Sequence, residues 1–486
     1  MPTLIVADWK LSYKNMHRKL FVSFITILLI LSCNQNSVYA QDAPTYPVYV
    51  VQPGETLTLI AEKFNTTVNE IINVNGIVDA NLISEGTELF IPGLEGISGR
   101  LLTRSVNVGE TLEDLSHANN IPLQTLLTLN KITSPNEVFV GTNIIIPVAD
   151  EGDALYVAHS MTNHDTLLEN AVRLQTNPWI VLDWNDIRTS NLLIANTPLY
   201  ASISADQAVS RISPYLKDIT IDPLPLEQGN TIVLTVQTTE ALDLGGTIDG
   251  HVLHFFPSSD QENSYYAIQG IHAMADPGLV DFNLSGSAAG QSLFSYDQML
   301  LQEEGVFIQD PPLYVQDETV DPAITQPEEE LVKSIISQIT PQRYWQGTFR
   351  YPVDGSVADD TIGFMSTYGN RRSYNGSEYI YFHTGLDFGV YVNSLTIYTP
   401  AAGVVAYTGN LTVRGGATFI DHGQGIFSGF FHQAEILVEE GDRVEAGDLI
   451  GIIGGTGRVT GPHLHWEIWA NGVQVNPVDW INNSYP

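Results

Sequence analysis

The sequence predicts a multidomain, mainly β protein built from three kinds of folding unit. Thr-Leu pairs recur every 55 residues near the N-terminus, at Thr56, Thr111 and Thr166, and a fixed period of this length is typical of repeated modules. Residues 215–308 alternate short apolar and polar runs between turn residues, as expected of a β-sandwich of immunoglobulin-like size. Residues 347–486 are rich in glycine and strand-forming runs, which predicts an antiparallel β-sheet domain.

The N-terminal segment, residues 1–40, predicts export of the chain. A basic stretch, His17 to Lys19, precedes an apolar run from Leu20 to Leu31 that is too short for a membrane-spanning helix. Two processing routes fit equally well: cleavage after Val38-Tyr39-Ala40, or a lipoprotein-type box, Leu29 to Cys33, that places a lipid on the only cysteine. We therefore expect an exported protein of the cell envelope, secreted or lipid-anchored at Cys33, without disulfides.

Each repeat has the pattern of a strand, two helices and a second strand. In the first copy, residues 46–93, we expect strands from Val48 to Val51 and from Glu88 to Ile91, with helices from Leu57 to Phe64 and from Val68 to Asn75. The second and third copies occupy residues 103–148 and 154–202. Modules of about 45 residues have marginal cores, so packing between neighbours is expected to help stabilise them.

The first two copies resemble LysM modules. The residues that carry the resemblance are Gly54-Glu55-Thr56-Leu57 with Asn75 and Ile91-Pro92, and Gly109-Glu110-Thr111-Leu112 with Asn130 and Ile146-Pro147. LysM modules bind N-acetylglucosamine polymers, so the resemblance implies docking on a glycan; the alternative is a spacer. The third copy has Asn163-His164-Asp165 in place of Gly-Glu and Ala201-Ser202 in place of Ile-Pro, so we expect it to keep the fold and lose sugar binding.

The middle of the chain is expected to act as a spacer. Strand-like runs such as Thr231 to Gln237 and Tyr265 to Gly270 belong to the predicted sandwich. An acidic, proline-containing linker, residues 309–346, follows. Its helix is expected to begin at Pro327, with acidic residues at the positive helix end, and such a linker permits relative domain motion.

Five polar side chains in the C-terminal region predict a hydrolytic metal site. They form three clusters: His383 with Asp387, His432 alone, and His463 with His465. Two histidines and one carboxylate leave a zinc ion open to water, so His383, Asp387 and one of the later pair are candidate ligands. The remaining imidazoles suit proton transfer. The chain must bend between His383 and Asp387, which Gly385 permits.

Some of these residues also fit two other interpretations. Two histidines and a carboxylate also form the facial triad of non-haem iron oxygenases, but the two additional histidines suit hydrolysis better. His432 beside Phe430 and Phe431 has the pattern of a packed core histidine. The five groups together, within one glycine-rich β segment, favour a functional site.

Residues 347–481 resemble the lysostaphin-like (LytM-type) zinc endopeptidases, which cut peptide cross-links in bacterial cell walls. The matching segments are Ser366 to Gly369 with Arg371, His383 to Phe388, Ile420 to Gly423, His432, Gly441 to Asp448, and Gly461 to Glu467. The resemblance implies that His383, Asp387 and His465 bind Zn²⁺ and that His463 and His432 form the catalytic pair. Phe430-Phe431 stands where relatives usually have Tyr-Gly, so one tyrosine hydroxyl is missing.

Composition narrows the range of partners. The chain has 55 acidic and 20 basic residues, a formal net charge of −35, which argues against binding to nucleic acid phosphates. We expect an exported zinc endopeptidase that cuts stem peptides or cross-bridges of peptidoglycan while its LysM repeats hold the glycan. The alternative is a catalytically silent wall-binding protein that recruits or activates another hydrolase, and the presence of all five site residues argues against it. A further hypothesis is that the linker covers the cleft.

Overall fold

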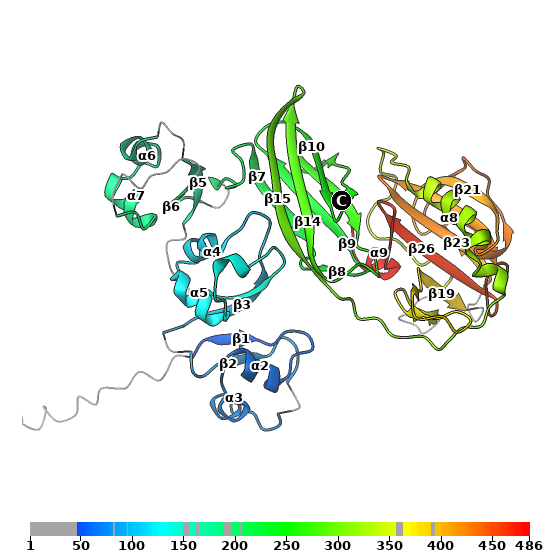
Figure 1. The fold of residues 1–486 in the computed structure, drawn as a ribbon, viewed down its shortest axis with the longest axis horizontal. Coiled ribbons are helices and arrows are strands. Elements are labelled where there is room, and N and C mark those ends of the chain that lie inside the picture. The colour runs from blue at the N-terminus through cyan, green and yellow to red at the C-terminus, as the bar shows by residue number, and fades with distance from the viewer. Residues whose placement is uncertain are drawn as a thin grey trace, which may run out of the picture. The chain divides into compact units, whose positions relative to one another are not determined.

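The computed structural model describes residues 46–80, 83–94, 96–148, 155–161, 165–188, 197–204, 207–355, 363–389 and 394–486. The predicted signal segment and Cys33 lie outside this range. By its contacts the chain divides between Ser98 and Gly99 into two compact units, and each is described by itself. Figure 1 shows small helical modules at the N-terminal end of the chain and strands in the rest.

The first unit is a single βααβ module. It contains β1 (Val48–Val50), α2 (Leu57–Lys63), α3 (Val68–Asn75) and β2 (Glu88–Phe90), and β1 pairs antiparallel with β2. The helices begin where Thr56 and Thr67 accept hydrogen bonds from backbone N–H groups of the first turn. Tyr49, Ile60 and Ile71 are fully buried between the strands and helices. The predicted element order is therefore present.

The second unit starts with two more modules of the same order. One contains β3 (Arg100–Ser105), α4 (Leu112–Ala118), α5 (Leu123–Leu129), the short 3₁₀ helix η1 (Pro135–Glu137) and β4 (Asn143–Val148). The other contains β5 (Tyr156–Ser160), α6 (Leu167–Arg173), α7 (Pro178–Trp184) and β6 (Pro198–Ala201). Both have their own apolar core clusters.

The repeated asparagines explain the sequence period structurally. The side chain of Asn75 accepts from Phe90 N (2.7 Å) and donates to Phe90 O (2.8 Å), which ties the second helix to the closing strand. Asn130 makes the same pair of bonds with Ile145, and Asn185 makes it with Tyr200. Each amide thus takes the place of a neighbouring strand. The third module keeps this bond although its sequence diverges elsewhere.

The middle region is a two-layered β-sandwich. Its strands are β7 (Leu216–Asp222), β8 (Leu226–Glu227), β9 (Thr231–Thr238), β10 (Asp243–Ile248), β11 (His251–Val252), β12 (Phe256–Pro257), β13 (Ser264–Gly270), β14 (Gly278–Ala288) and β15 (Gln291–Glu303). One sheet has the order β11-β10-β14-β15-β8 and the other β12-β13-β9-β7. Alternating residues of β9, including Ile232, Leu234 and Val236, enter the shared core.

The C-terminal domain is a largely antiparallel sheet of ten strands with additional short elements. They are β16 (Phe364–Ser366), β17 (Arg371–Arg372), β18 (Tyr381–Phe382), β19 (Leu386–Gly389), β20 (Thr396–Tyr398), β21 (Gly403–Leu411), β22 (Gly415–Gly423), β23 (Ile426–Ile436), β24 (Arg443–Val444), β25 (Leu449–Ile453), β26 (His463–Ala470), β27 (Val473–Val475) and α9 (Pro477–Asn482). The main path runs β16-β19-β26-β23-β22-β21-β24. The central strands β22, β23 and β26 are almost continuously buried, since both faces of the sheet are covered.

The sandwich is attached to this domain and is not a separate spacer. Phe256, Tyr266 and Ile268 of the sandwich belong to the same buried cluster as the core of the C-terminal domain. Hydrogen bonds cross the boundary, from Tyr266 Oη to Gln424 Oε1 (2.9 Å) and from Trp480 Nε1 to Thr231 Oγ1 (3.0 Å). The contact is made by aromatic side chains on the outer face of the sandwich. A sequence pattern can show that such residues are apolar, but not which domain they pack against.

The linker is also attached to the C-terminal domain. We call residues 308–321 the strap; it contains the 3₁₀ turn η4 (Asp317–Thr319). Its backbone bonds run along the segment 371–375: Arg371 N donates to Ile308 O (2.8 Å), Asp310 N to Arg371 O (2.9 Å), and Leu313 N to Ser373 O (2.9 Å). This segment of the linker is therefore not a loose connection: its polar backbone is paired with a neighbour distant in sequence.

The linker helix begins earlier than predicted. α8 spans Pro322–Ile336, with Asp321 as its N-cap and Pro322 in the first turn, while Pro327 lies inside the helix. The helix starts at Pro322 because the Asp321 side chain accepts from Ala323 N at 2.9 Å and so caps the first turn. Val332, Ile335 and Ile336 pack against Phe419, Phe427, Phe431 and Trp469 of the sheet, and Figure 1 shows α8 on its face.

Candidate active site

Three neighbouring strands position the predicted site residues. In the sheet, β26 lies between β19 and β23, so residues from three separate motifs meet at its N-terminal end. Asp387 of β19 is directly opposite His465 of β26, and Phe431 of β23 is opposite His465 on the other side. His383 lies just before β19. The strand register thus brings together groups that are up to 82 positions apart along the chain.

His383, Asp387 and His465 converge on one point. Asp387 Oδ1 lies 2.9 Å from His383 Nε2 and 2.6 Å from His465 Nδ1, and the two ring nitrogens are 3.0 Å apart. One ligand atom from each residue lies within 4.8 Å of the others, and all three residues are buried. This donor set of two imidazoles and one carboxylate fits a zinc ion with an open coordination position.

The other polar atoms of these three residues are occupied by fixed partners. His383 Nδ1 bonds the carbonyl of Thr367 at 2.8 Å, which leaves Nε2 facing the cluster. His465 Nε2 lies 2.9 Å from Glu467 Oε1, which leaves Nδ1 facing the cluster. Second-layer partners of this kind fix the tautomer and ring orientation of metal-binding histidines.

The outer oxygen of Asp387 is held by an arginine that connects to the strap. Arg372 Nη2 donates to Asp387 Oδ2 at 3.3 Å, and Arg372 Nε donates to Asp310 Oδ2 at 3.2 Å. Asn370 Nδ2 also donates to Asp310, at 2.8 Å. Asp387 therefore directs Oδ1 toward the metal cluster while Oδ2 is fixed from behind. Sequence reasoning missed this chain of contacts.

Burial and neighbouring charges shift the pKa values of the cluster residues in opposite directions. Burial alone would raise the pKa of Asp387, but His383 and His465 outweigh it and hold that pKa well below its usual range. Burial lowers the pKa of His383 to about 4, so its imidazole is neutral and available as a ligand at neutral pH. Burial would also lower the pKa of His465, but its contacts with Asp387 and Glu467 raise it.

His432 and His463 form a second pair beside the cluster. Their ring centroids are 4.8 Å apart, and His463 Nε2 lies 3.6 Å from Asp387 Oδ1. His432 Nδ1 donates to Thr456 O and His463 Nδ1 donates to Gly461 O, both at 2.8 Å. These bonds place the proton on Nδ1 and leave each Nε2 with a lone pair. Both imidazoles can therefore accept a proton.

The environment keeps this pair neutral. Burial, followed by the neighbouring His465 and His463, lowers the pKa of His432 to about 3. Burial likewise lowers the pKa of His463. His432 also has a left-handed backbone conformation, with a φ of +63°, which a non-glycine residue adopts only when its surroundings enforce it. Such local strain is characteristic of functional positions, although the sequence gives no indication of it.

Gly385 is required for a reason that differs from the one predicted. The chain leaves β18 at Phe382 and enters β19 at Leu386, so the segment between the strands includes His383 and Gly385. A β-carbon on Gly385 would lie 2.1 Å from the carbonyl oxygen of Trp466. Glycine therefore permits the backbone to approach β26 closely, which places His383 against His465.

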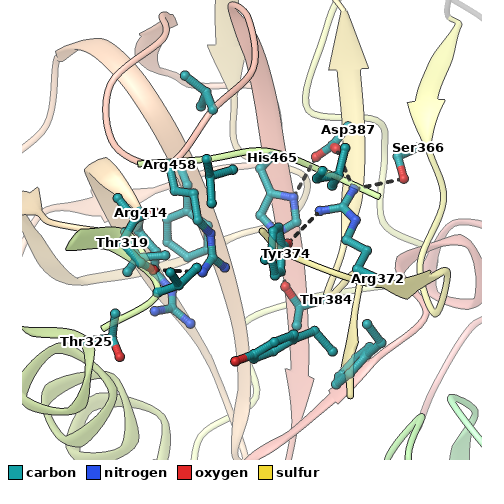
Figure 2. Close-up of a pocket in the computed structure, with 18 of the residues that line it drawn as sticks. Thr319, Thr325, Ser366, Arg372, Tyr374, Thr384, Asp387, Arg414, Arg458 and His465 are labelled. Atoms are coloured by element: carbon teal, nitrogen blue, oxygen red, sulfur yellow. Dashed lines mark hydrogen bonds and ion pairs between the residues drawn. The ribbon is translucent and has the colours of Figure 1, made fainter. Parts of the chain in front are cut away.

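The five predicted residues border one cavity of about 930 Å³, except for the fully buried His383. Figure 2 shows Asp387, His465 and Thr384 on one side and Arg414, Arg458 and Thr319 on another. The walls also come from the strap and from the sandwich residues His272 and Met274. The strap borders the cavity without separating it from Asp387 and His465, which also line it. A cavity of this size suits a peptide.

Two parts of the chain match known protein families. Residues 381–477 match peptidase family M23, and residues 49–92 and 105–147 match the LysM domain. The C-terminal domain is an M23 peptidase domain. M23 peptidases are zinc metallopeptidases, and the His-Asp-His cluster fits such an ion. The N-terminal part of the chain carries two LysM domains.

Two curated relatives each match only part of this chain. The Peptidoglycan DD-endopeptidase ShyA of Vibrio cholerae serotype O1 is 37% identical over 26% of this chain and 28% of its own length. The DD-carboxypeptidase/endopeptidase Mpg of Neisseria meningitidis serogroup B is 38% identical over 20% of this chain and 22% of its own length. The chain thus matches less than a third of each relative.

Among solved structures, an M23 peptidase from Pseudomonas aeruginosa is 24% identical, with a TM-score of 0.39 over 54% of this chain and 96% of that one. Among the residues that the structure describes, no helix is long and apolar enough to span a membrane.

Proposed function

We propose that this chain is an exported zinc endopeptidase that hydrolyses amide bonds in the peptide part of peptidoglycan. The observation that supports it most directly is the pair of neutral histidines, His432 and His463, beside a buried His-Asp-His cluster in a peptide-sized cavity. The names of the M23 relatives favour a DD-type amide as the bond that is cut. The LysM domains favour a glycan-bearing substrate.

In this proposal His383, Asp387 and His465 hold the zinc ion. When bound, zinc supplies Lewis-acid polarisation of the scissile carbonyl and a lowered pKa for a water molecule. His463 accepts the proton of the attacking water through Nε2, since Gly461 O occupies its Nδ1–H. The proton that His463 takes from the water goes on to the leaving amine. His432, whose ring centroid is 4.8 Å from that of His463, can receive this proton at Nε2, and in that state it stabilises the developing oxyanion and helps to protonate the leaving amine; these two roles can be exchanged.

Thr456 and Gly461 keep the two catalytic imidazoles aligned. Each backbone carbonyl fixes one ring through Nδ1, so proton transfer at Nε2 requires no tautomer change. Phe431 stacks on His465, with ring centroids 5.9 Å apart, and excludes water from one side of the cluster. Phe430, which stands at the position of the family tyrosine, is fully buried and brings no hydroxyl to the site.

Digestion of purified peptidoglycan by the zinc-loaded full chain tests the proposal. We expect new amine termini, identified by mass spectrometry of the released peptides, and a rate at least about 100-fold lower in His463→Ala, the usual effect of losing a general base. The variant should still bind one equivalent of zinc, because His463 is not one of the three ligands. Stoichiometric zinc without cleavage of wall or soluble peptides would instead support the alternative, a wall-binding activator.

A further inference from the structure

Three arginines face the cavity of this acidic protein. Figure 2 shows Arg372, Arg414 and Arg458 around it, although the whole chain has only 20 basic residues against 55 acidic ones. Two of them are neutralised by the protein itself. Arg372 pairs with Asp310 and Asp387, and Arg414 Nη1 lies 3.0 Å from Glu328 Oε1.

Arg458 is held in place without a carboxylate. Its guanidinium carbon lies 4.5 Å from the ring centroid of Tyr374, and Nη1 donates to Thr319 O at 3.0 Å. Among the residues that the structure describes, no acidic side chain forms an ion pair with it. The aromatic ring and the neutral carbonyl fix the orientation of the guanidinium but leave its charge uncompensated.

The loop that carries Arg458 also carries the partner of His432. Thr456 O accepts from His432 Nδ1, while Thr456 Oγ1 accepts from Gly416 N at 2.8 Å. Arg458 N donates to Val413 O at 2.8 Å. Gly457, at a φ of +78°, lies so close to Val413 and Gly415 that a β-carbon would clash at 2.5 Å. The loop is therefore fixed, and Arg458 has a defined position relative to the catalytic pair.

We propose that Arg458 binds a free carboxylate of the substrate peptide close to the scissile amide. The inference rests on the proposed function and names the chemical class that the cavity selects: a peptide that carries a carboxylate, as opposed to its amidated form. The planar fork of a guanidinium matches a carboxylate through two parallel N–H···O bonds.

A binding experiment tests Arg458 separately from catalysis. The full chain with His463→Ala, loaded with zinc, is titrated calorimetrically with a sugar-free, cross-linked stem-peptide dimer and with the same dimer amidated at its carboxylates. We expect the free acid to bind more tightly. Adding Arg458→Gln should weaken binding of the free acid by roughly 10- to 100-fold, the usual effect of losing a charged hydrogen bond, and leave the amidated dimer unchanged.

Two further variants control this experiment. Arg443→Gln removes an equal charge from an exposed position of the same domain that does not border the cavity, and should leave binding of both dimers unchanged. Arg458→Lys keeps the charge without the fork and should give intermediate binding of the free acid. Equal binding of the two dimers, no loss in Arg458→Gln, or no binding of either dimer overturns the proposal. Failure of the proposed function is a different result: dimers that bind and are not cleaved by the unmutated chain.

Discussion

Single histidines in the core of the M23 domain are kept neutral by burial. His422 is fully buried away from the metal cluster, where Nδ1 bonds Ala402 O at 2.8 Å and Nε2 bonds Ser428 Oγ at 2.9 Å. Burial lowers the pKa of His422 to about 4. The unfolded chain has the ordinary histidine value of about 6.5, so below that pH the unfolded state binds more protons than the folded one.

His422 therefore contributes stability above pH 6.5 that is lost as the pH falls toward 4. From the two pKa values, the contribution lost between pH 7 and pH 4 is on the order of 3 kcal/mol. We expect urea unfolding of the M23 domain, followed by tryptophan fluorescence, to be less pH-dependent in His422→Asn by about that amount. Equal pH dependence in both proteins would show that another group titrates in this range.

Glu467 is expected to control zinc affinity although it is not a ligand. Its Oε1 bonds His465 Nε2, and its Oε2 accepts from Gln474 Nε2 at 2.7 Å, so the carboxylate is fixed on both sides. Glu467→Gln keeps the shape and removes the charge. We expect zinc affinity to fall by about 10- to 100-fold, measured by competition with a chelator. Glu439→Gln, an exposed carboxylate outside the cavity, is the control, and equal affinities in the two variants would contradict this role.

At the scale of elements, the strap both borders the cavity and supports the site. If the strap only covered the cleft, loosening it would raise the rate of peptide cleavage. However, Asp310 holds Arg372, which holds the outer oxygen of Asp387. We therefore expect Asp310→Ala to lower kcat and zinc affinity by roughly tenfold, within the range for partners of metal ligands.

Asp317→Ala provides a matched control within the strap. Asp317 accepts from Asn375 Nδ2 at 3.0 Å, so its loss also loosens the strap but leaves the contact between Arg372 and Asp387 intact. We expect its kcat on a soluble stem-peptide dimer to stay near that of the unmutated chain. A higher rate in both variants would support the hypothesis that the strap covers the cleft.

At the scale of the whole molecule, the LysM modules differ in how they can be removed. The second module shares Val140 with the core of the sandwich, and Gly109 N donates to Gln298 Oε1 at 2.9 Å. Its deletion would damage the sandwich as well. The first module has its own core and belongs to a separate compact unit, and none of its residues belongs to the core of the sandwich.

Deletion of residues 46–98 is therefore expected to separate wall binding from catalysis. Cleavage of intact wall at low concentration should fall by about tenfold or more, since one of the tandem glycan sites is lost and effective concentration decreases. Cleavage of the sugar-free dimer should not change. Initial rates on both substrates measure this, and equal losses on the two would show that the module stabilises the M23 domain.

Several features could be read from the chain because they depend on local spacing and side-chain chemistry. The five site residues, the repeats and the sandwich follow from motifs and periodicity, and the structure brings His383, Asp387 and His465 within bonding distance of one another. Helix boundaries are less certain in sequence: the helix predicted to begin at Pro327 begins at Pro322, because Asp321 caps its first turn.

The sequence by itself determined which side chains are available for the proposed chemistry, since the histidines and the aspartate of the site lie in short motifs. Only the tertiary structure decided which nitrogen of each imidazole faces the cluster, that the strap supports Asp387 through Arg372, and that Arg458 keeps an uncompensated charge. These properties depend on contacts between segments far apart in the chain. Strand register and packing set such contacts, and no local pattern encodes them.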